Sequence, residues 1–112
     1  MSRDLDFVRE LLLEMESEGD YALRTLSNGT SPKELNHILI MTDAGLLVEV
    51  GRHSYRVSWA GYDYLDAVRD DATWRKTKSA LSKIGGGTFE IAKELAVAFI
   101  KQAAKDKLGI VL

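Results

Sequence analysis

The chain has 112 residues, of which 46% are hydrophobic and 29% are charged, and its formal net charge is −2. This length and composition predict a single globular domain with a substantial core. The chain contains no cysteine, which excludes disulfides and thiolate metal sites and favours a cytoplasmic location. Its first residues have no apolar signal core and charges interrupt every later apolar run, so neither secretion nor a membrane span is expected.

The charge is distributed unevenly along the chain. Residues 1–60 contain six lysine and arginine residues against ten aspartate and glutamate residues, which gives a net charge of −4. Residues 61–112 contain nine against seven, which gives +2. Because surfaces that bind nucleic acid carry excess positive charge, the acidic first half argues against non-specific nucleic-acid binding there.

The first predicted element is a helix over residues 4–18. Apolar residues recur there at helical spacing, and Gly19 is a suitable residue to end the helix. Residues 21–26 favour a short extended segment, which turn-forming residues close.

The second predicted helix has a clear start and a clear end. Ser31 is a good N-cap, Pro32 suits the first helical position, Glu34 completes a capping box, and Gly45 ends the helix. The side predicted to pack inward consists of Leu35, Ile38, Leu39, Met41 and Thr42. The side predicted to face outward consists of Lys33, Asn36, His37, Ile40, Asp43 and Ala44.

The rest of the chain predicts a hairpin followed by helices. Residues 46–50 and 55–59 favour β-strands around a four-residue tip at 51–54. Helical patterns then cover residues 63–83, and the three glycines at 85–87 break them.

A last helix is predicted over about residues 88–108, capped by Thr88. Its apolar residues cover more than half of its circumference, which exceeds the stripe that packing on one small domain needs. Two interpretations follow: the helix associates with a second chain, giving a homodimer, or it lies deep in a groove of its own domain.

The order of these elements resembles a winged helix. The stretch LNHILIMTDAGLL resembles the recognition-helix region of small winged-helix repressors, and YRVSWAGYDYLDAV resembles a second wing strand leading into the next helix. Ser58, Gly61 and Leu65 match the Ser/Thr-x-x-Gly-x-x-x-Leu pattern found at that place. The expected fold is therefore an α+β, winged helix-turn-helix-like domain with a small β-hairpin wing and extra C-terminal helices. Within one domain spanning residues 1–112, residues 1–60 form the core with the wing and residues 61–112 a helical extension.

A closer resemblance covers nearly the whole chain. The segments RDLDFVRELLLEME, DAGLL, WAGYDYLDAVRDDATWRKTK and GGGTFEIAKELA together resemble domain-of-unknown-function family 2513, which is bacterial and prophage-associated. The resemblance implies a winged-helix-like fold and a phage or prophage setting. It supplies no activity and no catalytic residues.

The first functional hypothesis is double-stranded DNA binding in transcription regulation. Lys33, Asn36 and His37 on the second helix would reach the groove, since such side chains match the donors and acceptors of base edges. The contacts to the DNA backbone would come from the wing residues Arg52, His53 and Arg56, with Arg24 nearby. These cations are too few for strong binding by a monomer.

The alternative hypothesis is a protein-interaction module that does not bind DNA. Ile40 sits near the centre of the predicted outward side of the second helix, where an apolar residue more often marks packing against a partner. Phe99 and Ile100 on the last helix are the corresponding candidates for the homodimer contact.

Catalysis, metal binding and cofactor binding are not expected. Asp63, Asp66 and Asp70 share one helix face, which spreads carboxylates along the axis and predicts a solvated acidic face. The three glycines lack the Gly-Lys-Ser/Thr of a phosphate loop, and no arrangement of histidine with serine or carboxylates indicates a catalytic site. Trp59 and Trp74 are predicted to be buried where the hairpin meets the following helices.

Overall fold

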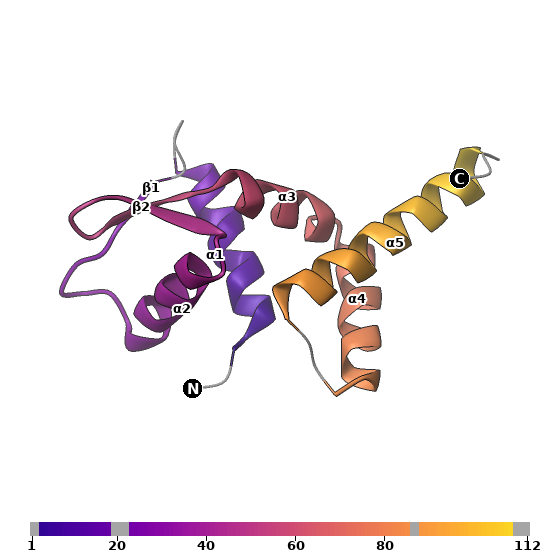
Figure 1. The fold of residues 1–112 in the computed structure, drawn as a ribbon, viewed down its shortest axis with the longest axis horizontal. Coiled ribbons are helices and arrows are strands. Elements are labelled where there is room, and N and C mark those ends of the chain that lie inside the picture. The colour runs from indigo at the N-terminus through magenta and orange to yellow at the C-terminus, as the bar shows by residue number, and fades with distance from the viewer. Residues whose placement is uncertain (1–2, 19–22, 86–87, 109–112) are drawn as a thin grey trace. The chain divides into compact units, whose positions relative to one another are not determined.

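The computed structural model describes residues 3–18, 23–85 and 88–108. It confirms the predicted α+β class with a β-hairpin wing and additional C-terminal helices (Figure 1). In chain order, the described residues form α1 (Leu5–Ser17), β1 (Leu23–Thr25), α2 (Pro32–Asp43), β2 (Leu47–Gly51), β3 (Ser54–Val57), α3 (Trp59–Val68), α4 (Asp71–Lys83) and α5 (Phe89–Leu108).

The chain divides into two compact units, Met1–Leu65 and Asp66–Leu112. The first unit contains α1, α2 and the sheet, and the second contains α4 and α5.

The three strands form one antiparallel sheet in the order β1-β3-β2. One face of the sheet turns inward, because Tyr55 and Val57 on the central strand are both buried. The other face is exposed, and there Arg56 lies between Leu23 and Val48. The register shifts by one residue between Glu49 and Gly51, next to the hairpin turn.

The core of the first unit lies between the inner face of the sheet and the two helices α1 and α2. The apolar stripe of α1 packs inward as predicted, and Asp4 caps this helix by accepting the Phe7 N–H at 3.1 Å. The buried residues of this core are Val8, Leu11, Leu12, Met15, Ile38, Met41, Leu46, Leu47, Tyr55, Val57, Tyr64 and Leu65.

A tight joint connects the end of α2 to the start of α3. The Ser58 hydroxyl donates to the Gly45 carbonyl and accepts the Gly61 N–H at 2.9 Å, while the Ser58 N–H donates to the Leu46 carbonyl at 3.0 Å. A Cβ added at Gly61 would lie 2.1 Å from the Leu46 carbonyl oxygen. The Ser58–Gly61 pattern therefore has a packing role, because a side chain at residue 61 would separate the two backbones.

The start of α3 corrects the sequence prediction for this region. The helix begins at Trp59, whereas the sequence predicted a strand through Trp59 and a helix from residue 63. Trp59 is 85% exposed, so its predicted burial is wrong, whereas the predicted burial of Trp74 is confirmed. Since Ser58 caps α3, Trp59 occupies the first turn and points away from the core.

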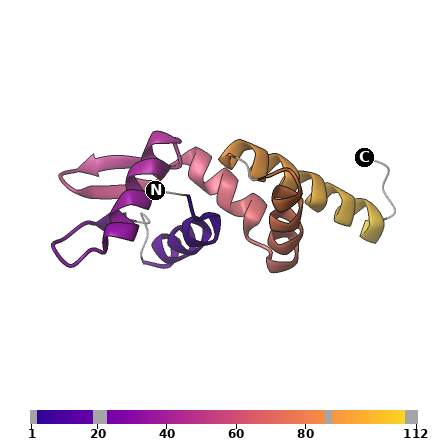
Figure 2. The same ribbon diagram turned by 90° about the horizontal axis from the view of Figure 1, so that it is seen from below.

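The second unit is built on the packing of α5 against α4. Asp70 caps α4 by accepting the Thr73 N–H at 2.8 Å, and Trp74 is buried one residue further along. On α5, the buried residues Phe89, Ala92 and Ala96 all lie in the first half of the helix. The second half extends beyond α4, as both views show (Figures 1 and 2).

Candidate interaction surface

The ends of α2 are those that the sequence predicts. The Ser31 hydroxyl accepts the Glu34 N–H at 3.1 Å, Pro32 is the first helical residue, and Gly45 follows the helix with a φ of 83°. Only the orientation of the helix about its axis differs from the prediction, and this decides which side chains reach solvent.

His37 corrects the predicted outward side of α2, because it is only 1% exposed. Its Nε2 accepts the backbone N–H of Asp4 at 3.1 Å, and its Nδ1 lies 2.8 Å from the Lys33 carbonyl oxygen. Since Nε2 accepts, Nδ1 must carry the proton and donate, which makes the ring neutral. The Phe7 ring packs edge-on against it, with the centroids 4.9 Å apart. Both nitrogens are occupied, so the imidazole has none left for a base edge.

Lys33 is half exposed, but its charge is already engaged. Its Nζ lies 3.0 Å from Asp4 Oδ2 and 4.6 Å from the centroid of the Phe7 ring. The N–H of Phe7 and, after it, the ammonium of Lys33 hold the pKa of the Asp4 carboxyl below its usual value. A groove contact by Lys33 would require it to leave this carboxylate.

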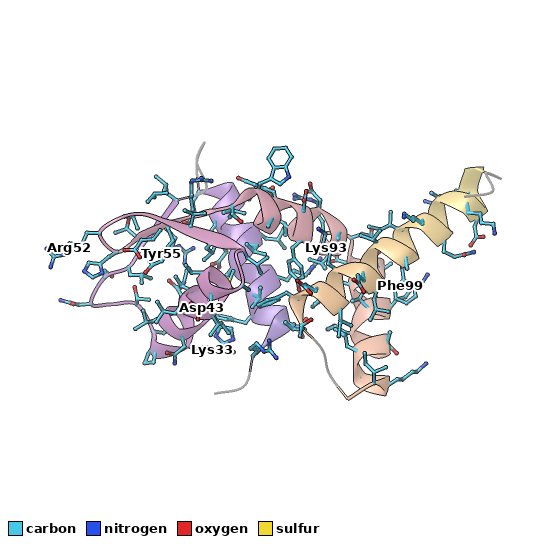
Figure 3. The ribbon with its side chains drawn as sticks, in the orientation of Figure 1. Lys33, Asp43, Arg52, Tyr55, Lys93 and Phe99 are labelled. Carbon is cyan, nitrogen blue, oxygen red and sulfur yellow. The ribbon has the colours of Figure 1, made fainter. Side chains whose placement is uncertain are left out.

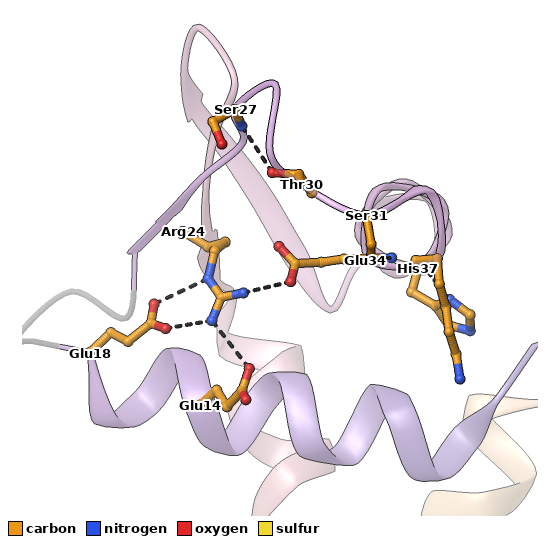
Figure 4. A network of polar contacts seen from close by, with 9 residues as sticks. Glu14, Glu18, Arg24, Ser27, Thr30, Ser31, Glu34 and His37 are labelled. Atoms are coloured by element: carbon orange, nitrogen blue, oxygen red, sulfur yellow. Dashed lines mark hydrogen bonds and ion pairs between the residues drawn. The ribbon is translucent and has the colours of Figure 1, made fainter.

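Arg24 occupies the centre of a cluster of carboxylates (Figure 4). Its guanidinium contacts Glu18 and lies 3.3 Å from Glu14 on α1, while Nη1 lies 3.0 Å from Glu34 on α2. Hydrogen bonding to Glu18 is the main reason that the pKa of Arg24 is raised above its ordinary value. One cation among three carboxylates leaves a local charge of −2, so the expected phosphate contact by Arg24 is not supported.

Beyond its first turn, where Pro32 and Lys33 are exposed, the surface of α2 that reaches solvent consists of Leu35, Asn36, Leu39 and Asp43, and we call these four residues the α2 outer face. Leu35 is 39% exposed and Leu39 is 44% exposed, so the prediction that both pack inward is wrong. Ile40, the predicted centre of the outward side, is half-buried. We attribute this orientation of α2 about its axis to His37, because its two hydrogen bonds form with the imidazole facing the start of α1.

The wing presents its cations differently. Arg52 and His53 are exposed at the hairpin turn, where His53 has a φ of 61°, and Arg52 projects from the tip (Figure 3). Neither residue forms an ion pair within the part of the chain that the structure describes. Arg56 is exposed further along on the outer face of the sheet, where its Nη1 donates to the Val57 carbonyl at 3.2 Å.

The α2 outer face and the wing meet at a shallow hollow. The hollow is lined by Leu26, Ser27, Asn28, Leu35 and His53. The structure thus brings Leu35 and the wing tip together, and leaves His37 and Lys33 at the start of α1. Sequence reasoning missed Leu35 and Leu39 because apolar residues at helical spacing are normally the buried ones.

The candidates for self-association on α5 lie in its second half. Ile100 is 39% exposed and Phe99 is half-buried, so this part of the helix is only partly covered.

The aspartates of α3 and α4 have structural partners. Arg69 lies 2.9 Å from Asp66, and Asp70 is the N-cap of α4. Within residues 3–18, 23–85 and 88–108, no group of three or more histidine, aspartate and glutamate residues is placed to hold a metal ion. None of the helices in these ranges combines the length and apolar character that crossing a membrane requires.

Comparison with known proteins places the chain in a family. Residues 2–88 match the family model described as "Hypothetical protein (DUF2513)". The chain belongs to the DUF2513 family. An uncharacterized protein of Haemophilus influenzae is 26% identical over 115 residues, which cover 91% of this chain and 98% of that protein. No solved structure matches the chain. The match confirms the family resemblance in the sequence, and the DUF2513 model ends immediately before α5.

Proposed function

We propose that this DUF2513 protein is a non-enzymatic protein-binding module whose partner docks on the α2 outer face. The observation that carries the proposal is the composition of that face: two leucines and an aspartate are exposed where a winged-helix protein would read DNA. Asp43 forms no ion pair within the described residues. The fold alone does not assign the function, so we argue the function from the residues exposed on this surface.

The energetics of this face favour a protein over DNA. Covering the exposed parts of Leu35 and Leu39 would stabilise a complex by about 1 kcal/mol each, because apolar area leaves water. A phosphate brought to the same place would meet Asp43 and, beside α2, the carboxylates around Arg24. The partner that fits has apolar side chains flanked by lysine or arginine.

Because the chain has no cysteine, a single introduced thiol can carry a photo-cross-linker to a chosen position. We expect Asn36→Cys, labelled in this way and irradiated in a bacterial lysate, to yield a discrete protein adduct. Adding Leu35→Ser and Leu39→Ser to the labelled protein should remove the adduct, because the apolar contact is lost. A matched label at Lys76→Cys, which is exposed on α4, serves as the control.

Two results would contradict the proposal. One is an adduct that survives both serine substitutions while the same adduct forms from Lys76. The other is micromolar binding of duplex DNA, measured by fluorescence anisotropy at low salt, that is lost on Asn36→Ala.

A second candidate function is weak DNA binding by the wing, in a transcription-regulating or phage-type setting. The observation that favours it is that Arg52 and His53 are exposed and form no ion pair with the described residues, with Arg56 exposed nearby. Phosphate contacts from the two arginines predict a salt dependence with a log–log slope of about −2 for duplex DNA. Anisotropy titrations of the native protein and of Arg52→Ala with Arg56→Ala test this. Unchanged affinity in the double variant would show that the wing does not contact DNA.

A further inference from the structure

The exposed side of α5 carries an ordered pattern of charge. This side lies opposite the buried residues Phe89, Ala92 and Ala96. Acidic residues occupy its first half, basic residues occupy its second half, and two small apolar residues separate them. In order, the residues are Glu90, Glu94, Val97, Ala98, Lys101 and Lys105, all of them exposed except the half-buried Val97.

Within one helix this pattern is unfavourable. Glu90 and Glu94 are four residues apart, as are Lys101 and Lys105, so each pair places like charges side by side on the helix surface. None of the four forms an ion pair with the described residues. Glu90 and Lys105 lie in the first and last turns, where the helix dipole favours their charges. That effect falls off within one turn, so it does not account for Glu94 and Lys101.

A second α5 running in the opposite direction would match every one of these charges. If the two-fold axis passes between Val97 and Ala98, Glu94 lies opposite Lys101 of the second copy and Glu90 lies opposite its Lys105. The small residues at the centre allow the two helices to approach closely. A parallel arrangement would instead place glutamate against glutamate and lysine against lysine.

We propose that this side of α5 is a self-association surface, on which a second copy of the chain docks its own α5 in antiparallel orientation. The length of α5 makes room for the partner, since its second half extends beyond α4 (Figures 1 and 2). The surface is distinct from the α2 outer face, so each proposal stands or fails without the other. It is also distinct from the side of α5 that carries Phe99.

Charge reversal and sedimentation equilibrium test the pairing. At about 50 mM salt, we expect a reversible dimer that weakens at about 500 mM salt, because exposed ion pairs are screened. Glu94→Lys and Lys101→Glu should each weaken the dimer by about tenfold, since each places like charges opposite one another. The double variant, Glu94→Lys with Lys101→Glu, should recover the dimer because the pair is restored with opposite signs. Lys76→Glu on α4 is the control for a changed net charge, and circular dichroism checks that α5 stays helical.

A disulfide test fixes the direction of the helices. Ala98→Cys places the chain's single thiol next to the same thiol of the second copy, so mild oxidation should give a covalent dimer. The thiols of Glu90→Cys would lie about 22 Å apart in the antiparallel pair, at 1.5 Å per residue, and should not cross-link.

Three outcomes would overturn the proposal. The first is a native protein that remains a monomer at every concentration at low salt. The second is a dimer that neither charge reversal weakens, or one that the double variant fails to recover. The third is a dimer that Ile100→Asp disrupts while both charge reversals leave it intact, which would place the interface on the other side of α5.

Discussion

α2 and the β2–β3 hairpin are the two elements that a winged-helix protein presents to DNA, and they differ in how their charged residues are used. On α2, Lys33 is held by Asp4, and Glu34 is held by Arg24. At the hairpin tip, Arg52 has no ion-pair partner within the described residues. Whether a lysine or arginine is free to contact DNA therefore depends on which carboxylates lie beside it in the folded chain. The position of the residue in a winged-helix motif does not reveal those neighbours.

The largest effect is expected from breaking the joint that holds both elements in place. Gly61→Ala would bring a Cβ to 2.1 Å from the Leu46 carbonyl oxygen, a contact that requires the backbone to move. We expect the free energy of unfolding to fall by roughly 3 kcal/mol, as for severe overpacking. Urea denaturation measures it, with Gly29→Ala as the control, where the added Cβ would meet an atom at 3.7 Å. Equal stabilities for the two variants would contradict the role of the joint.

A smaller effect tests the orientation of α2. His37→Leu leaves the Asp4 N–H and the Lys33 carbonyl without the imidazole, so the free energy of unfolding should fall by about 2 kcal/mol. Asn36→Leu, at the exposed neighbouring position, should change it by no more than about 0.5 kcal/mol. If both leucine variants lost the same stability in urea denaturation, the inward position of His37 would be wrong.

The smallest effect concerns the carboxylate that holds Lys33. The pKa of Asp4 is below its usual value of 3.8 in the folded protein, so its contribution to stability is present above that pH and is lost as the pH falls through the folded-state pKa. Asp4→Asn keeps the cap but removes the charge. Below about pH 4 the native protein should therefore lose about 0.5 kcal/mol more than this variant, as expected for an exposed pair.

Denaturation series at pH 7 and at pH 2.5 measure the difference between the native protein and Asp4→Asn. Parallel pH profiles for the two proteins would show that Asp4 does not hold Lys33 through its charge. The hairpin provides the contrast, because no carboxylate among the described residues pairs with Arg52 and so links it to the same acid transition.

The sequence predicts elements well where the signal is local. The start of α2 at Ser31 and Pro32 and its end at Gly45 follow from residues within one turn of each boundary. The inward side of the same helix does not follow, because the hydrogen-bond partner that orients His37 is Asp4, 33 residues earlier in the chain. The apolar periodicity predicted that Leu35 and Leu39 are buried, whereas the buried position is occupied by the imidazole of His37.

The candidate site was predicted only in part for the same reason. The wing residues Arg52 and His53 are exposed as expected, since a hairpin tip has few neighbours. The engagement of Arg24 depends on Glu14, Glu18 and Glu34 from two helices, and no spacing in the sequence indicates it. For Trp59 a local signal existed: Ser58 followed by Gly61 marks the start of a helix, whose first residue points to solvent.

The close approach at Gly61 also bears on how such proteins are recognised in genomes. Position 61 accepts only a hydrogen atom because of a neighbouring backbone carbonyl, and Ser58 is fixed by two backbone partners. Neither residue contributes a side chain to the α2 outer face or to the wing tip. A substitution at either position is therefore expected to disturb the joint, whatever the protein binds. A search pattern built on Ser58 and Gly61 would find chains with the same joint between α2 and α3. Whether those chains bind similar partners would have to be judged from the residues that they carry at positions 35, 39 and 43.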